Sequence, residues 1–431
     1  MRCCDGHAAR LRRPTDSSEP PDHDVSECSH RPRRGVRHHG AVIDVAAERA
    51  DTPGCLDQAF LDSAGSSLPT TRVVDAVVAH LRREAEVGGY RAAAERADDL
   101  AAVPVVLGRL LGCDPDLVAL SDSATRSWNQ FVTAIRWAPG DRILICGTEY
   151  ASNAIALLQR ARIDGCSVEV VPNGPDGLVD LDALSALLDE RVRLVSLVHV
   201  PTNSGQVAPV REVVECAHDV GALVLLDACQ SVGQLRVDVE DLGVDALSAT
   251  GRKWLRAPRG TGFLYVRRSI LEGLEPAAAD MRGATWTAPD GYELESGARR
   301  FELWEYDVAS RLGLKMAVEH LLRLGVDDVE AAVRSRAADL RTALSEVPRV
   351  VLRDAGADLS GVVSFTVDGV DAADVRDRLL AQDVTVAVSG LPSTRLDMTA
   401  RGLGAVVRAS PHYFVSSDDI EAAAAAVARV R

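Results

Sequence analysis

Apolar runs of strand length alternate along most of the chain with segments whose apolar residues recur at helical spacing. Val73, Val77 and Leu81 are spaced as on one face of a helix running from about residue 70 to 95, and residues 101–111 predict a second helix. Short apolar runs typical of strands occur at residues 142–146, 193–200, 222–227 and 263–266. The run at 222–227 is apolar up to its final acid, which is typical of a strand buried on both faces.

The two ends of the chain differ from this central pattern. Residues 1–45 are rich in Arg, His and Pro and lack hydrophobic periodicity, which predicts a disordered extension. From about residue 326 the pattern predicts two helices, a strand at 362–367, a helix at 372–381, and a final strand and helix. We therefore expect a large domain over residues 46–325 and a small α+β domain over residues 326–431.

Composition and charge limit the possible partners. The chain has 431 residues, of which 47% are hydrophobic and 26% charged. This length and composition are enough for a large and a smaller domain, each with its own hydrophobic core. Its net charge of −15 argues against nucleic acid or an anionic membrane as a partner, because both attract basic patches. No apolar run has the length of a membrane span. The nine cysteines are an odd number without metal-site spacing, which favours a reducing cytoplasm and predicts no metal.

The strongest chemical signal is Lys253 in the stretch Leu247-Ser-Ala-Thr-Gly-Arg-Lys-Trp254. The chain contains two lysines against 46 arginines, so an amine at this position suggests chemistry that a guanidinium cannot perform. Taken alone, Lys253 could equally be a surface charge. Asp227 closes the apolar run at 222–227, at the sheet edge where open α/β folds bind ligands, although an acid there also suits a helix cap. Together, the amine and the acid fit the two groups that pyridoxal phosphate requires.

Two motifs carry a resemblance to a known family. The segments Leu226-Asp-Ala-Cys-Gln-Ser-Val-Gly-Gln234 and Ser248-Ala-Thr-Gly-Arg-Lys-Trp-Leu-Arg-Ala-Pro-Arg-Gly-Thr-Gly262 resemble the class V aminotransferases, which are fold type I enzymes dependent on pyridoxal phosphate. The resemblance runs from about residue 60 to the C-terminus. It implies an α/β fold with a large, doubly wound, mostly parallel sheet and a smaller C-terminal α+β domain. It also implies that Lys253 forms a Schiff base with the cofactor and that Asp227 holds the ring nitrogen.

Further cofactor contacts follow from the same resemblance. The turn in Leu120-Ser-Asp-Ser-Ala-Thr-Arg-Ser-Trp-Asn129 opens a helix, whose free N–H groups suit a phosphate. The expected phosphate contacts are Ala124, Thr125, Thr250 and Arg252. Tyr150 stands where many members have a catalytic His that stacks on the ring; its aromatic face is expected to stack there in the same way, although a phenol is a poorer proton shuttle near neutral pH. Either Thr202 or Asn203, together with Gln230, is expected at the cofactor oxygen.

The resemblance also implies how substrate and subunits meet. Arg408, in Leu403-Gly-Ala-Val-Val-Arg-Ala-Ser-Pro-His-Tyr413, is expected to bind the α-carboxylate of an amino acid, and Arg395 a distal carboxylate. The segment 299–306 is expected near the partner's site in a homodimer. Trp304 and Glu305 stand where the family commonly has Gly and Thr, so the cross-subunit phosphate bond is in doubt.

The reaction expected from these parts is carbon–sulfur β-lysis of a cysteine S-conjugate, in secondary or thiol metabolism. Cysteine desulfurases use a Cys late in the chain, and no Cys follows Cys229. Decarboxylation, oxidative deamination, epimerisation and transamination remain open, because related enzymes use the same residues for them. A non-enzymatic regulator that binds pyridoxal phosphate is the remaining alternative, and it is disfavoured because no DNA-binding module is visible in the sequence.

Overall fold

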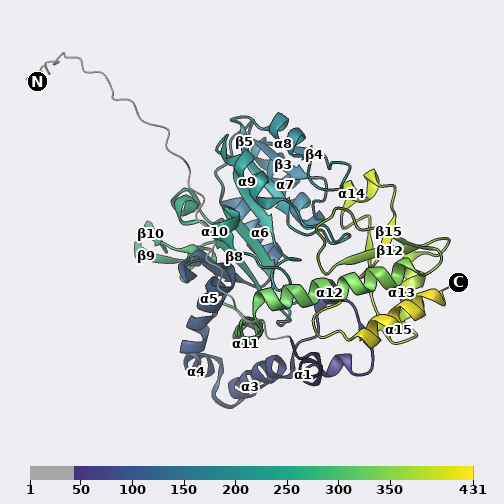
Figure 1. The fold of residues 1–431 in the computed structure, drawn as a ribbon. Coiled ribbons are helices and arrows are strands. Elements are labelled where there is room, and N and C mark those ends of the chain that lie inside the picture. Colours follow the sequence, from purple (N-terminus) through teal and green to yellow (C-terminus); the bar gives the residue numbers. More distant parts are fainter. Residues whose placement is uncertain (1–42, 431) are drawn as a thin grey trace, which may run out of the picture. The chain divides into compact units, whose positions relative to one another are not determined.

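The computed structural model describes residues 43–430 (Figure 1). The predicted disordered extension, residues 1–45, lies outside the described residues except for 43–45, and the first helix, α1 (Val45–Ala50), begins where that prediction ends. Among the described residues, no helix combines the length and the apolar character that crossing a bilayer needs.

The core of the described chain is a seven-stranded sheet with the order β2-β8-β7-β6-β5-β3-β4. Its strands are β2 (Val118–Ser121), β3 (Arg142–Cys146), β4 (Ser167–Val171), β5 (Val192–Val198), β6 (Leu223–Asp227), β7 (Ala246–Thr250) and β8 (Gly262–Val266). All neighbours from β4 to β7 pair in parallel, and β8 is antiparallel to both β7 and β2. The predicted strands at 142–146, 222–227 and 263–266 therefore fall within a residue or two of the observed ones.

Helices connect and cover these strands (Figure 1). They are α6 (Ala124–Ala134), α7 (Ala151–Asp164), α8 (Leu181–Leu187), α9 (Val210–His218) and α10 (Val239–Leu242). Val224, Leu225 and Leu226 of β6 are completely buried, as a continuous apolar run predicts for a central parallel strand. The carboxyl ends of β3, β5, β6 and β7 consequently meet at one edge, where their following loops form a common site.

A layer of helices packs beside the sheet. Its helices come from residues 71–111 and from residues 308–324. The layer contains α3 (Thr71–Val87), α4 (Gly89–Ala94), α5 (Ala97–Leu111) and α11 (Val308–Leu324), with α11 packed on α3 and α5, while the one-turn helix α2 (Ser63–Ser66) lies in the segment before α3. The single helix expected up to residue 95 is interrupted at Gly88, whose φ of 85° ends α3. The hairpin β9 (Ala284–Ala288) and β10 (Gly291–Leu294) precedes α11.

The C-terminal part forms a second, antiparallel sheet with the order β11-β12-β15-β14. Its elements are α12 (Val326–Ser345), β11 (Val350–Leu352), β12 (Val363–Val367), α13 (Ala372–Leu380), β13 (Val384–Thr385), β14 (Ala387–Gly390), α14 (Arg395–Ala400), β15 (Ala405–Ala409) and α15 (Ser417–Ala428). The prediction of two helices after residue 326 was wrong. One helix, α12, is followed by β11, a short and partly exposed edge strand whose three residues give too little pattern to be recognised.

The N-terminal strap, residues 59–68, links this second sheet to the Lys253 turn. Strand β1 (Ala59–Phe60) pairs in parallel with β13, and the Ser410 N–H donates to the Leu61 carbonyl at 2.7 Å. Further along the strap, the Ser67 N–H donates to the Arg252 carbonyl at 2.9 Å. The strap therefore connects β15, which carries Arg408, with the turn that carries Lys253.

Candidate active site

Lys253 and Asp227 line the same cavity, at the edge where the parallel strands end. Asp227 is the last residue of β6, and Lys253 lies in the turn after β7. The cavity has a volume of about 100 Å³. Its described lining is Ser123, Ala124, Thr125, Tyr150, Asn153, Val198, Val200, Thr202, Asp227, Cys229, Gln230, Ser248, Thr250, Arg252 and Lys253. The structure thus brings together nine of the sequence-predicted residues.

Burial tunes the Lys253 amine. Loss of hydration lowers the pKa of Lys253, and the nearby carboxylate of Asp227 partly opposes this effect. A lowered pKa increases the fraction of neutral amine, which is the form that attacks a carbonyl. The main chain close to the lysine is held firmly by Arg256, three residues further on. Arg256 is buried with φ of 61°, and its guanidinium donates to the Leu68 carbonyl and the Tyr413 hydroxyl.

Asp227 is fixed by two hydrogen bonds. Its Oδ1 accepts from the Cys229 N–H at 2.9 Å, and its Oδ2 accepts from the Asn153 side-chain amide at 2.9 Å. Asp227 is 7% exposed and lines the cavity together with Lys253. A buried carboxylate held in this way suits a cationic ring nitrogen, because a carboxylate removed from water is stabilised by a positively charged partner.

The opposite end of the cavity is built from the start of α6. Ser123 caps this helix by accepting from the Arg126 N–H, and Ala124 and Thr125 are its first two residues. Gly262 lies against this turn, where a Cβ atom would come within 2.4 Å of the Ser123 carbonyl carbon. Ser248 donates to the Ala124 carbonyl at 2.9 Å and Thr250 lines the same wall. Free N–H groups, hydroxyls and the Arg252 guanidinium make this end suitable for a phosphate.

The sequence left two points open, namely the choice between Thr202 and Asn203 and the role of Tyr150, and these residues lie in different surroundings. Thr202 lines the cavity, and its hydroxyl accepts from Arg408 Nη1 at 2.7 Å. Asn203 is completely buried and donates instead to Asp397 at 2.6 Å. Tyr150 is 36% exposed and lines the cavity as the residue before α7, where its ring is accessible to a flat group.

Gln230 is held at both ends of its side chain. Its Nε2 donates to the Ala64 carbonyl at 3.0 Å, and its Oε1 accepts from the Trp254 indole at 2.9 Å. Because Nε2 has a second hydrogen, Gln230 can still donate into the cavity that it lines. The same residue therefore joins the strap, the β6 loop and the turn after Lys253.

The two arginines expected at the substrate lie in different environments. Arg408 on β15 donates from Nη1 to Thr202 and from Nη2 to Asp62, at 3.0 Å, and it is largely buried. Arg395 is exposed at the first position of α14, and none of the described residues that line the cavity belongs to that helix.

Several polar residues of the site were not identified from the sequence. They are Asp62, Ser123, Glu149, Asn153, Cys229 and Ser248. Two signals could have found Glu149 and Asn153: Glu149 lies three residues after the apolar run at 142–146, and the spacing of four between the two residues puts them on the same side of a helical turn. Asp62 gave no such signal, because its partner Arg408 lies 346 residues away.

These groups fit pyridoxal phosphate. The cavity offers a buried amine for the aldehyde, a fixed carboxylate for the ring nitrogen, an accessible aromatic ring for the pyridine face and a helix start for the phosphate. The absence of a side chain at Gly262 keeps the helix start in place.

Comparisons with known proteins agree with this geometry. The aminotransferase class-V family model matches residues 59–423. The probable cysteine desulfurase 2 of Mycobacterium leprae is 31% identical over 410 residues, covering 90% of this chain and 96% of its own. The probable hercynylcysteine sulfoxide lyase of Mycobacterium tuberculosis is 31% identical over 375 residues, covering 85% and 89%.

Solved structures show the same fold. The crystal structure of the cysteine desulfurase CsdA from Escherichia coli has a TM-score of 0.83 at 24% identity, covering 90% of this chain and 98% of its own. The cystine C-S lyase C-DES, in complex with cysteine persulfide, has a TM-score of 0.79 at 24% identity, covering 88% and 99%. The expected α/β fold with a large, mostly parallel sheet is confirmed. By its match over residues 59–423 and by these relatives, the chain belongs to the aminotransferase class-V family of pyridoxal phosphate enzymes.

Proposed function

We propose that this pyridoxal phosphate enzyme breaks the carbon–sulfur bond of a cysteine S-conjugate or a related amino acid, in secondary or thiol metabolism and in the cytoplasm. The observation that carries the proposal is the cavity in which a buried amine, Lys253, faces the same space as Asp227. Two relatives support the choice of bond, because one is named as a sulfoxide lyase and the other as a cysteine desulfurase.

The cysteine in the cavity favours a lyase over a desulfurase. Burial and the charge of Asp227 raise the pKa of the Cys229 thiol well above its ordinary value. A thiol that keeps its proton is a poor nucleophile, so Cys229 is badly suited to take sulfur from a substrate. A β-lyase needs no such thiol.

The roles of the cofactor-binding residues follow from the same cavity. Lys253 carries the cofactor, Asp227 holds its ring nitrogen and Tyr150 covers its ring. Thr202 or Asn203, with Gln230, contacts the ring oxygen, and the lining of the cavity favours Thr202. The phosphate is held by Ala124, Thr125, Thr250 and Arg252. Bound in this way, pyridoxal phosphate supplies the electron sink that stabilises negative charge at the substrate Cα.

The chain's own groups perform the remaining steps. Arg408 binds the substrate carboxylate through its guanidinium fork and orients the Cα–H bond. The Lys253 amine would take the Cα proton of the bound substrate, and its lowered pKa suits a base that must be neutral to accept a proton. The Cβ–S bond then breaks with its electron pair on sulfur, which takes up a proton from the Lys253 ammonium and leaves as a thiol or sulfenic acid. One water is consumed as the three-carbon fragment is released as pyruvate and ammonia.

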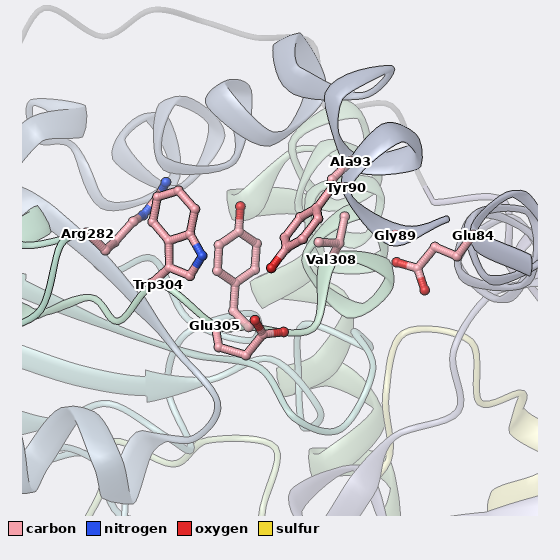
Figure 2. A pocket seen from close by; sticks show the side chains of 9 residues that line it. Glu84, Gly89, Tyr90, Ala93, Arg282, Trp304, Glu305 and Val308 are labelled. Carbon is pink, nitrogen blue, oxygen red and sulfur yellow. The ribbon is translucent and has the colours of Figure 1, made fainter. Parts of the chain in front are cut away.

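We further propose a homodimer and the domain division expected from the sequence, with a large domain to residue 325 and a small domain from residue 326. The dimer is supported by an exposed aromatic hollow beside the segment 299–306 (Figure 2). Tyr90 is 82% exposed and Trp304 48% exposed, and both line this hollow together with Glu305. Aromatic side chains exposed this widely are typical of an interface with another protein surface.

The experiment that tests the function compares wild type with Lys253→Ala and with Lys315→Ala. Lys315 is the matched control, because it is the only other lysine and pairs with Asp99 and Glu319 on the helical layer. We expect visible cofactor absorbance and pyruvate from S-methylcysteine sulfoxide in wild type and Lys315→Ala, and neither in Lys253→Ala. Alanine and sulfide from cysteine, without pyruvate, would instead indicate a desulfurase. Cofactor absorbance without either product would leave decarboxylation, epimerisation or transamination.

A further inference from the structure

Glu149 is a buried carboxylate that the reaction above does not use. It lies in the loop between β3 and α7 and is 2% exposed. Its Oε1 accepts from the Tyr150 N–H at 2.8 Å and from the Asn153 amide at 3.0 Å, and its Oε2 is bonded to the Ser196 hydroxyl. Within residues 43–430, no cationic side chain forms an ion pair with Glu149, so charge neutralisation does not explain its burial.

Asn153 connects Glu149 with Asp227. The single amide nitrogen of Asn153 donates to Glu149 Oε1 at 3.0 Å and to Asp227 Oδ2 at 2.9 Å, one hydrogen for each carboxylate. A carboxylate only accepts, so the amide cannot turn its oxygen towards either acid without losing a bond. Glu149 therefore fixes the orientation of the donor that holds one oxygen of Asp227, while the Cys229 N–H holds the other.

The two acids also interact through their charges. Burial raises the pKa of Glu149 to about 7, the bonds from Ser196 and Asn153 oppose this rise, and the charge of Asp227 adds to it. The other titratable group facing Glu149 is Cys146 at the end of β3, whose pKa is raised by burial and by Glu149. If Glu149 takes up a proton on Oε2, it can donate to Ser196 and leave the Asn153 bridge intact. Its charge can thus change without a change of geometry.

We propose that Glu149 is a positioning residue for the cofactor: through Asn153 it fixes the Asp227 carboxylate towards the ring nitrogen, and its charge adds to the negative potential there. The inference rests on the proposed function, because it requires pyridoxal phosphate at Asp227 and Lys253. Both effects favour a protonated ring nitrogen, which is the form that withdraws electrons best.

Glu149→Gln separates the charge from the geometry. The glutamine oxygen can accept from Tyr150 and Asn153, and its amide can donate to Ser196, so the bonds persist while the negative charge is lost. The measurement is the pH dependence of the visible absorbance of the cofactor-loaded protein. We expect its midpoint to fall by roughly half a pH unit to one unit, because a nearby negative charge favours protonated forms of the bound cofactor.

Asp245→Asn is the matched control. Asp245 is also buried and accepts from the Val224 N–H, but it precedes β7 at the opposite edge of the sheet. We expect its absorbance midpoint to equal that of wild type. Glu149→Leu, which removes the acceptors as well, should in addition weaken pyridoxal phosphate binding by about tenfold, the loss expected when a charged hydrogen-bond network is broken.

The outcomes distinguish this inference from the proposed function. A wild type without a visible band that depends on Lys253 would overturn both. A wild type with the band, together with Glu149→Gln and Asp245→Asn variants that share its midpoint, would overturn the role of Glu149 alone. Glu149→Gln keeps the test decisive even if Glu149→Leu does not fold, because the glutamine preserves the buried bonds.

Discussion

The carboxylate of Asp62 lies against the guanidinium of Arg408, with 3.0 Å between Oδ1 and Nη2. Asp62 comes from the N-terminal strap and Arg408 from β15, so the pair joins two segments far apart in the sequence. The Arg408 Nε–H is buried and has no partner among the described residues. Burial raises the pKa of Asp62, which makes this acid easier to neutralise than an ordinary aspartate. If Arg408 binds the substrate as proposed, one edge of its guanidinium would exchange the Asp62 carboxylate for that of the substrate.

Arg408→Lys should raise KM for the amino-acid substrate by about 10- to 100-fold with a smaller change in kcat. A lysine keeps the charge but loses the planar fork that binds a carboxylate with two bonds, a difference of about 1.4 to 2.8 kcal/mol. Steady-state kinetics with S-methylcysteine sulfoxide measure both constants. An unchanged KM would show that another residue binds the carboxylate.

Arg395→Gln tests the second carboxylate contact expected from the sequence. Because Arg395 is exposed at the start of α14, its removal should leave folding and cofactor absorbance unchanged. KM should rise, by about three- to tenfold for an exposed contact, only for conjugates that carry a second carboxylate, such as S-carboxymethylcysteine. Equal KM values for the variant and wild type with that substrate would remove Arg395 from the site.

Gly262→Ala should weaken pyridoxal phosphate binding. An added Cβ would come within 2.7 Å of the Ala124 nitrogen and 2.4 Å of the Ser123 carbonyl carbon, so the start of α6 must move away from the phosphate. We expect a loss of about 10-fold or more in affinity, since main-chain donors act only at close range. Gly273→Ala is the control, because apart from its own chain neighbours no heavy atom of the described residues lies within 4 Å of its added Cβ. Equilibrium dialysis of both variants measures the difference, and equal affinities would contradict the role of this turn.

Local patterns predicted the parts of the molecule that local physics determines. The apolar run before Asp227 could only be buried on both faces, and a buried parallel strand places its final residue at the ligand-binding edge. Lys253 was recognised because an amine is rare in this arginine-rich chain. The roles of Ala124, Thr125, Tyr150 and Gln230 came from the family resemblance and remain predictions.

Contacts between distant segments could not be read from the sequence. The Asp62–Arg408 pair depends on the strap lying between two sheets, and no spacing rule relates residues so far apart. The break at Gly88 was missed because a glycine with positive φ leaves the apolar spacing on either side unchanged. Asn153 was missed because its role depends on two carboxylates from different elements, Glu149 and Asp227.

His412 should make the folded protein sensitive to acid. It is completely buried among Trp254, Tyr413 and Phe414, and burial lowers its pKa to about 3. Its Nδ1 accepts from the Tyr413 N–H at 2.9 Å, and its Nε2 donates to the Trp254 carbonyl at 3.0 Å. Only the neutral ring can make both bonds at once, because a protonated Nδ1 could no longer accept from Tyr413.

The sign of the effect follows from proton binding. The unfolded chain takes up a proton at His412 near pH 6.5, whereas the folded protein does not until about pH 3. The stability contributed by the neutral ring is therefore complete above pH 6.5 and is lost as pH falls towards 3, by about 1.4 kcal/mol per unit. Between pH 6.5 and 5, we expect the free energy of unfolding measured in urea to fall by about 2 kcal/mol less for His412→Gln than for wild type. The variant should nevertheless be less stable than wild type at pH 7. Parallel losses in the two proteins would mean that His412 is already protonated in the folded state, in which case Nδ1 could not accept from the Tyr413 N–H.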